Sequence, residues 1–293
     1  HIHYHCQNFL GTVDRSIEAR VDTDRSEIFR RGHVTRIRPF PISIDFEEAN
    51  RFARSAEVEA AMLRWHERIP GLRGRKLGAS IERLDYTKGI PQRLHGIERF
   101  FDQHPEWLRK LCFVQIAVLS RDDLASYQSE QAAADQVVAR INDRFGTPDW
   151  QPVHFLKEHH GPADMMALHR LADLFMVNSL HDGMNLVAKE FLASRSDERG
   201  VLVLSNFTGA SRELTQAVCV NPYAIEEVSH AIESALTMSP RRQQQRMRLM
   251  REQIASTWAL AWFEVERQAL AQMQHPAIAQ IFDAGTTPEG HAF

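Results

Sequence analysis

The sequence predicts an α/β fold built around a parallel sheet, and two observations carry the prediction. Between residues 76 and 256, apolar stretches typical of strands alternate strictly with stretches typical of helices. Strict alternation indicates right-handed βαβ units whose parallel sheet is covered by helices on both faces. The length of 293 residues, with 43% hydrophobic and 25% charged residues, suits one large globular domain or two ordinary ones.

Charge, hydropathy and cysteine content narrow the class of protein. The net charge of −3 gives no bulk attraction to nucleic acid or to an anionic membrane, and there is no apolar run of about 18 residues that would span a membrane. The three cysteines, Cys6, Cys112 and Cys219, are scattered, which favours a reducing cytoplasm over a disulfide framework. Because the chain starts without Met and stops after a strand-like stretch, we expect a piece of a longer protein.

The first 72 residues are mixed in character. Residues 5–19 carry apolar side chains at helical spacing, and residues 32–45 look like a strand whose prolines mark an edge or a loop. Residues 46–69 are rich in helix-forming residues, and residues 70–76, "PGLRGRK", are typical of a linker. This change of pattern places a domain boundary near residue 72.

The residues that follow predict six strands with helices between them. A proline, Pro91, opens the first of these helices. The expected strands are 76–84, 111–119, 152–157, 173–180, 200–205 and 217–222. The expected helices are 91–105, 123–145, 162–172, 185–195, 224–238 and 240–256, with a helical turn at 209–214.

Ligands of parallel α/β sheets bind beyond the carboxyl ends of the strands. The loops that follow the strands are therefore the candidates for function. They are residues 83–91, 119–123, 157–162, 180–186 and 205–211.

The first loop reads "ERLDYTKGIP". Arg83 and Lys88 flank a tight turn that ends at Gly89, and Pro91 opens the next helix. Two cations and a helix N-terminus at the end of a strand suit an anion site. A solvated basic turn beside a structural Asp85 fits the same residues, so the spacing alone leaves both interpretations open.

The second loop, "VLSRDDL", places Arg121 just beyond a strand, and either following aspartate can cap the next helix. On its own, Arg121 is typical of a surface residue.

The fourth loop reads "HDGMNLVAKE". Asp182 and Gly183 form the turn, and residues 185–188 would offer free backbone N–H groups to a phosphate at the start of the helix. Glu190, one turn further on, could accept hydrogen bonds from sugar hydroxyls. Alternatively, Asp182 is only an N-cap and Glu190 only balances the helix dipole. The loop before Glu213 repeats this pattern of a strand, a glycine turn and an early acid.

Histidines give a weaker signal for a metal site. His1, His3 and His5 alternate as they would along a strand, and His159 and His160 are adjacent. Zinc sites need three or four convergent ligands, so we do not favour a metal site. The sequence also lacks a G-x-S-x-G elbow and a Walker A loop.

Five motifs, taken together, resemble one family: "RLDYTKGIP", "QIAVLSR", "DGMNLVAKE", "VLVLSNFTGASREL" and "VNPYAIEEV". In order and spacing, across about residues 1–260, they are similar to the trehalose-6-phosphate synthase family of retaining glycosyltransferases, family 20. The resemblance implies the two-Rossmann-domain GT-B architecture. Residues 1–72 would then be the C-terminal remnant of the acceptor-side domain, and residues 73–262 the donor-binding domain.

The resemblance also implies a role for each matching residue. Arg83 and Lys88 would bind the donor diphosphate, and Asp182 would bind hydroxyls of the transferred glucose. Glu190 would bind the ribose, and Arg121 would face the phosphate of the acceptor. The remaining donor-binding positions would be the helix start, Gly183, Met184, Asn185, Leu186 and Val187, and the uracil border, His160 and Met165.

Members of this family transfer glucose from UDP-glucose, as co-substrate, to glucose 6-phosphate with retention, and require no cofactor or metal. The alternatives are a glucosylglycerol-phosphate synthase, which uses glycerol 3-phosphate, and a non-catalytic nucleotide-sugar-binding module. We expect a sugar or polyol phosphate as second substrate and a homo-oligomer as one possible assembly.

Two substitutions depart from the family, which usually has Arg at His181 and often an aromatic residue at His160. These substitutions bear on pH dependence and on the choice of UDP over ADP or GDP. Most of the family's first Rossmann domain, which binds the acceptor, has no counterpart here. We therefore expect this piece alone to bind donor weakly and to be inactive.

The tail, residues 263–293, resembles part of the small lobe of a bacterial Ser/Thr protein kinase. Glu266 would match the helix glutamate that pairs with the ATP-binding lysine. The tail lacks the other kinase motifs, so it could not phosphorylate a substrate. A C-terminal helix of the glycosyltransferase family is the alternative.

Overall fold

A computed structural model describes residues 2–118 and 125–256 of this chain, with side chains omitted for residues 125–127. Contacts divide the described residues into two units, residues 2–44 and residues 45–256. The tail with Glu266 and the loop with Arg121 lie outside the described residues.

The described part of the first unit has one helix and a small antiparallel sheet. Helix α1 (His3–Ser16) precedes β1 (Arg20–Asp22), β2 (Glu27–Arg30) and β3 (His33–Arg36), which pair in that order. Leu10, Val13 and Ile28 form its core. His3 and His5 lie in α1, so the strand-like alternation of histidines was wrong. Helical spacing prevails because Cys6, Leu10 and Val13 are all buried on one face.

The second unit contains the predicted parallel sheet, in the order β6-β5-β4-β7-β8-β9. Every strand pairs in parallel with its neighbours. The strands are β4 (Lys76–Arg83), β5 (Leu111–Val118), β6 (Val153–Leu156), β7 (Leu174–Val177), β8 (Val201–Ser205) and β9 (Val218–Val220). The strand order reverses between β4 and β7, and such a switch point opens a crevice for ligands in open α/β sheets.

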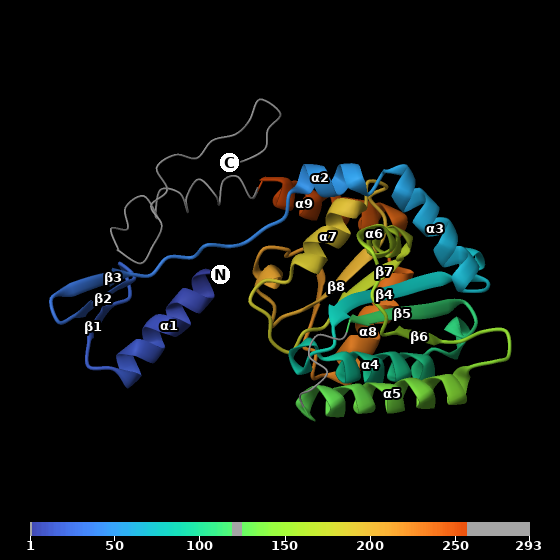
Figure 1. The fold of residues 1–293 in the computed structure, drawn as a ribbon, viewed down its shortest axis with the longest axis horizontal. Helices are drawn as coiled ribbons and strands as arrows, with labels where there is room; N and C mark the ends of the chain where they lie inside the picture. The colour runs from blue at the N-terminus through green and yellow to red at the C-terminus, as the bar shows by residue number, and fades with distance from the viewer. Residues whose placement is uncertain (1, 119–124, 257–293) are drawn as a thin grey trace. The chain divides into compact units, whose positions relative to one another are not determined.

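Helices cover both faces of this sheet (Figure 1). The helices α4 (Ile90–Gln103), α5 (Ala125–Phe145) and α8 (Ile225–Thr237) pack together on one face. The second group is α2 (Phe46–Phe52), α3 (Ala56–Arg68), α6 (Pro162–Leu171), α7 (Leu186–Ser194) and α9 (Pro240–Ser256). Short 3-10 turns are η1 (Leu72–Gly74), η2 (Tyr86–Lys88), η3 (Pro105–Trp107) and η4 (Gly209–Arg212). All strands and helices predicted between residues 76 and 256 are present.

The unit boundary falls at Asp45, earlier than the boundary near residue 72 that the sequence suggested. Helix α3 packs against α6, and α2 packs against α7 and α9. These two helices therefore belong with the parallel sheet by contact. The assignment of residues 1–72 to an acceptor-side domain stays a prediction.

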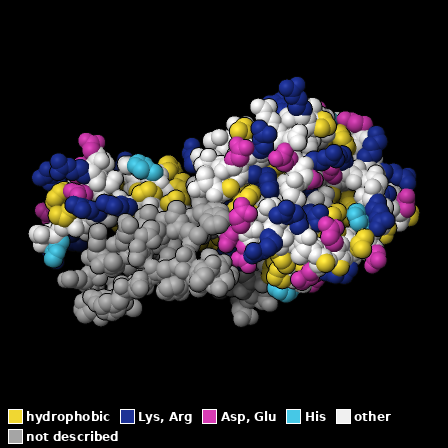
Figure 2. All heavy atoms as spheres, turned by 90° about the horizontal axis from the view of Figure 1, so that it is seen from above, with side chains coloured by type: hydrophobic (Ala, Val, Ile, Leu, Met, Phe, Trp, Pro, Cys, Tyr) yellow, Lys and Arg dark blue, Asp and Glu magenta, His cyan; other side chains and the backbone are white. Residues whose placement is uncertain are grey.

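None of the described helices is long and apolar enough to cross a membrane. On the face of the sheet unit seen in Figure 2, basic and acidic side chains are interspersed. Such a mixed surface agrees with the small net charge of −3.

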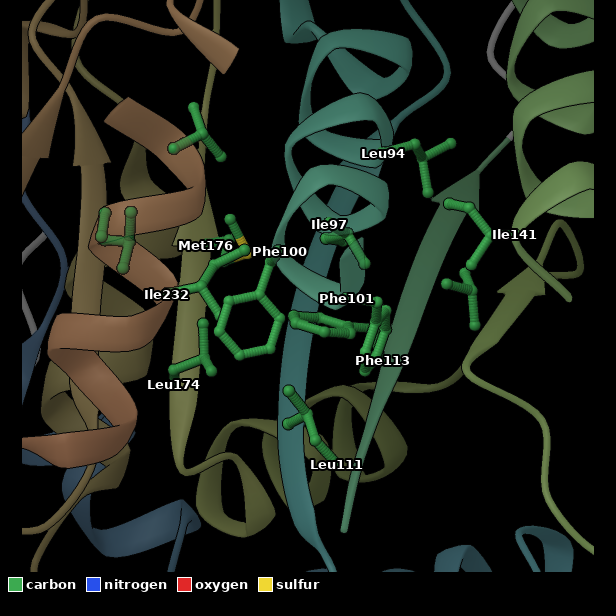
Figure 3. Packing of buried hydrophobic residues seen from close by; sticks show 14 of the residues in the cluster. Leu94, Ile97, Phe100, Phe101, Leu111, Phe113, Ile141, Leu174, Met176 and Ile232 are labelled. Carbon is green, nitrogen blue, oxygen red and sulfur yellow. The ribbon is translucent and has the colours of Figure 1, made fainter. Parts of the chain in front are cut away.

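The main core lies between the sheet and the α4, α5 and α8 layer (Figure 3). Phe101 of α4 is fully buried there and meets Phe113 and Trp150 edge-on, with ring centroids 6.1 and 6.0 Å apart. This core fixes α4, and α4 carries the loop after β4 at its N-terminus.

We predict that Phe101→Ala lowers the free energy of unfolding by about 3–5 kcal/mol, because it removes a large buried ring and leaves a cavity. Leu63→Ala is the control, since Leu63 is exposed on α3 and surface changes usually stay within about 0.5 kcal/mol. Urea unfolding measures both. Equal effects of the two changes would contradict this account of the core.

Candidate functional site

Backbone hydrogen bonds join the loops after β4 and β7 at the switch point. The carbonyl oxygen of Thr87 accepts from the N–H groups of Leu180, at 2.7 Å, and His181, at 3.3 Å. Gly89 has a positive φ of 63°, and a Cβ there would lie 2.7 Å from the carbonyl oxygen of Asn178. Only glycine suits this crossing, because another residue would strain both the backbone and the contact.

The loops after β7 and β8 are joined in the same way. The N–H of Asp182 donates to the Phe207 carbonyl at 3.1 Å, and the N–H of Gly209 donates to the Asp182 carbonyl at 3.0 Å. A Cβ on Gly209 would lie 2.1 Å from the carbonyl oxygen of Gly183. Three strand-end loops thus form one hydrogen-bonded surface.

Lys88 and Asp182 meet on this surface. Lys88 Nζ lies 2.6 Å from Asp182 Oδ2, and their side chains are 14% and 15% exposed. Asp182 also accepts from Asn185 Nδ2, at 3.1 Å, and from the N–H of Met184, at 3.4 Å. Burial raises the pKa of Asp182, but these three donors outweigh burial and hold the pKa below its usual value. Asp182 is therefore a carboxylate at neutral pH.

Asn185, and not Asp182, caps helix α7. Asn185 has a positive φ of 79°, and its Oδ1 accepts from the N–H of Ala188 at 3.0 Å. The alternative in which Asp182 is only an N-cap is therefore wrong. Of the expected donors, the N–H of Ala188 is used by the cap, whereas those of Leu186 and Val187 bond to no acceptor among the described residues. Those two groups can serve an anion.

Glu190 lies within α7 and is half-buried. Its carboxyl accepts no hydrogen bond from the described residues, and burial alone raises its pKa. A half-buried acid without a protein partner lowers the stability of the folded chain, and a hydroxyl-bearing ligand would supply that partner.

The two predicted cations differ in setting. Arg83 is exposed at the end of β4 and pairs with no acid among the described residues. Lys88 is half-buried and paired. The structure thus brings Lys88, Asp182 and the start of α7 together, whereas Arg83, at the end of β4, makes no hydrogen bond or ion pair with them.

His160 and Met165 lie after β6 and on α6. His160 is buried and stacks on Trp65 of α3, with ring centroids 5.4 Å apart. Its Nδ1 lies 2.9 Å from the Glu158 carbonyl, and its Nε2 lies 3.3 Å from Arg68 Nη1. Met165 is half-buried. These contacts give the His160 ring a packing role against α3.

Two buried ion pairs beneath the loops were missed from the sequence. Lys189 Nζ lies 2.7 Å from Glu213 Oε2, which joins α7 to the loop after β8 and explains the early acid at Glu213. Arg93 pairs with Glu82. Apolar neighbours around Lys189 in "NLVAKEFL" were a signal that this lysine is buried.

The described residues contain no group of three or more His, Cys, Asp or Glu side chains that could hold a metal ion.

Comparisons with known proteins give a consistent match. The model of glycosyltransferase family 20 matches residues 1–272. An α,α-trehalose-phosphate synthase [UDP-forming] of Botryotinia fuckeliana is 36% identical over 98% of this chain and 54% of its own length. That of Pichia angusta is 36% identical over 90% of this chain and 55% of its own. The chain thus spans about half the length of these curated relatives.

Solved structures agree. A UDP-forming α,α-trehalose-phosphate synthase from Burkholderia xenovorans, in complex with glucose-6-phosphate, has a TM-score of 0.87 and 31% identity, over 92% of this chain and 58% of its own. The E. coli trehalose-6-phosphate structure bound with UDP-2-fluoro glucose has a TM-score of 0.85 and 31% identity, over 93% and 60%. The predicted α/β fold of GT-B type is confirmed.

We predict that Glu190→Gln raises the free energy of unfolding at pH 7. Partial burial raises the folded-state pKa of Glu190 above its usual value of 4.5, so the stability that this group contributes is fully present below pH 4.5 and is lost as pH rises through the raised pKa. The difference between variant and wild type should therefore grow with pH above 4.5. Urea unfolding between pH 4 and 8 measures it.

The control for this series is Glu252→Gln, at an exposed position on α9. Its effect should stay within about 0.5 kcal/mol throughout. A Glu190→Gln variant that is less stable than wild type at pH 7 would show that the carboxylate has a partner.

Proposed function

This chain belongs to glycosyltransferase family 20, and from that premise we propose that its protein transfers glucose from UDP-glucose to glucose 6-phosphate with retention, forming trehalose 6-phosphate. The relatives named above as UDP-forming synthases support the reaction. The observation that carries the proposal is the contact of Lys88 with Asp182 beside the free N–H groups of α7. A cation and free N–H groups at a helix start suit a diphosphate at a switch point, and a carboxylate beside them suits the sugar hydroxyls.

Each group has a distinct task in this proposal. Lys88, with Arg83, binds the diphosphate and stabilises the charge of the leaving nucleotide. An ammonium has three donors, so Lys88 can bind a phosphate oxygen and keep Asp182 as a partner. The N–H groups of Leu186 and Val187 add neutral donors to the same phosphates, as expected for the region from Gly183 to Val187.

Asp182 and Glu190 act as hydroxyl acceptors. Asp182 is ionised and is held by three donors, so it can orient the glucose hydroxyls. Glu190 accepts from the ribose hydroxyls, which supply the partners its half-buried carboxyl otherwise lacks. We keep Arg121 as the contact to the acceptor phosphate, and the segment of His160 and Met165 as the border of the uracil.

Retention follows from attack and departure on the same face of the sugar. The bond from the anomeric carbon to the phosphate oxygen breaks, and the bond to the acceptor oxygen forms. The acceptor proton passes to the leaving phosphate. Asp182 is a poor nucleophile because its charge is already shared with Lys88, which fits a route without the paired carboxylates that retaining glycosidases use.

The proposal also covers the division into domains, the cellular compartment and the assembly. Residues 1–72 would close the acceptor-side domain and residues 73–262 would form the donor domain. The cysteines Cys6, Cys112 and Cys219 are all free thiols, which supports a reducing cytoplasm. A homo-oligomer remains a prediction.

We predict that Lys88→Met in the full-length protein lowers kcat with UDP-glucose by about 10²–10³, the usual effect of removing one group that stabilises developing charge. Lys76→Met is a matched control, because Lys76 lies at the other end of β4 and pairs with Asp173 at 2.7 Å. It should leave kcat within about twofold. Equal losses in both variants would contradict the role of Lys88.

An acceptor assay tests the reaction itself. The full-length protein should form trehalose 6-phosphate from UDP-glucose and glucose 6-phosphate, and not glucosylglycerol phosphate from glycerol 3-phosphate. The product is identified by mass and by the anomeric coupling in its NMR spectrum. Tight UDP binding without any transfer would instead support the non-catalytic module. The 293-residue chain alone should bind UDP-glucose weakly and transfer none.

A further inference from the structure

A buried arginine lies directly beneath the Lys88 loop. Arg93, the fourth residue of α4, is 1% exposed. Its backbone N–H donates to the Gly89 carbonyl at 3.0 Å, which ties the helix start to the turn. The guanidinium group is a cation, so a buried positive charge lies beneath this loop.

The guanidinium reaches four different segments. Nη2 pairs with Glu82 near the end of β4 and lies 3.4 Å from the carbonyl oxygen of Lys88. Nη1 donates to Gln115 Oε1 on β5 at 2.5 Å. Nε lies 3.4 Å from Asn178 Oδ1, just after β7. One side chain therefore links both strands that flank the switch point, β4 and β7, to the backbone of Lys88.

Glu82 completes the network. Its side chain is 1% exposed, and Ser179 Oγ donates to its Oε1 at 3.3 Å. Glu82 thus neutralises Arg93 and also contacts the residue after Asn178. Ser179 lies three residues before Asp182, so this network supports both partners of the Lys88–Asp182 contact from below.

We propose that Arg93, with Glu82 as its counter-ion, is a positioning residue that holds Lys88 within contact of Asp182 and thereby sets the geometry of diphosphate binding. The effect of Arg93 on catalysis rests on the proposed function, whereas its effect on the position of Lys88 does not. A lysine at position 93 would keep the positive charge, but its single ammonium group could not donate to all four acceptors at once, as the planar guanidinium does.

The test uses the full-length protein and removes both charges together. A variant that loses only one partner leaves the other charge buried and unpaired, which is strongly destabilising, whereas neutral pairs are often tolerated. We therefore choose the double variant Glu82→Gln with Arg93→Met. We expect it to fold, to lose at least tenfold in kcat with UDP-glucose, and to change KM for the donor by less than threefold.

The matched control is Glu98→Gln. Glu98 lies on the same helix, is buried, and pairs with Arg140 and Arg144 of α5. It should lower the melting temperature while leaving kcat within twofold. If the double variant behaves like this control, Arg93 is only structural and the proposal is overturned.

A second readout does not depend on activity. Lysine labelled with 13C at Cε gives a signal for Lys88, assigned with Lys88→Arg. In the double variant, that signal should move to the position it has in Asp182→Asn, because the contact is lost in both. An unmoved signal overturns the proposal even if the protein transfers no glucose. Absent transfer by wild type would reject the proposed function alone.

A milder variant covers the case in which the double variant does not fold. Gln115→Met removes one acceptor of Arg93 at nearly constant volume and leaves the ion pair in place. We expect a threefold or greater loss in kcat and a partial shift of the Lys88 signal. Wild-type values for both would overturn the proposal.

Discussion

The buried charge of Arg93 constrains how the loops of the site are arranged. A guanidinium that is 1% exposed must be met by acceptors on every side, because an unpaired buried charge costs several kcal/mol. The acceptors come from the ends of β4 and β7, from β5 and from the backbone of Lys88. Satisfying this charge therefore brings together the loops that carry the candidate functional groups.

Above this network, polar groups divide into those that hold the loops and those left for a ligand. Asn185 caps α7, and Lys189 with Glu213 ties α7 to the loop after β8. Because these side chains hold the loops together, other polar groups at the site remain available to bind a ligand. Asp182 and Glu190 keep acceptor capacity, and the first N–H groups of α7 stay available.

The site also bears a cost in stability. Glu190 is half-buried without a polar partner among the described residues, and Asn185 holds a positive φ of 79°. Position 209 accepts only glycine, because a Cβ there would clash with the backbone of Gly183. Such local costs are tolerated where a site must be preorganised, and the large core around Phe101 supplies the stability that offsets them.

Much of the fold could be predicted because it rests on local patterns. Alternating apolar and helical stretches specified six strands, their helices and the loops that follow them, and the motifs singled out Lys88, Asp182 and Glu190. The strand-like stretch of residues 32–45 contains β3, but β1 and β2, three and four residues long, escaped prediction because they are too short to show a period.

Only the tertiary structure decided which of these residues meet. The strand order places β4 beside β7, and so brings Lys88 to Asp182, 94 residues further along the chain. It also buries Arg93, which by sequence is one more cation on an amphipathic helix, and makes Asn185 rather than Asp182 the cap. Periodicity reports which face of an element is apolar. Partners far apart in the chain are set by strand order and packing, which no local pattern contains.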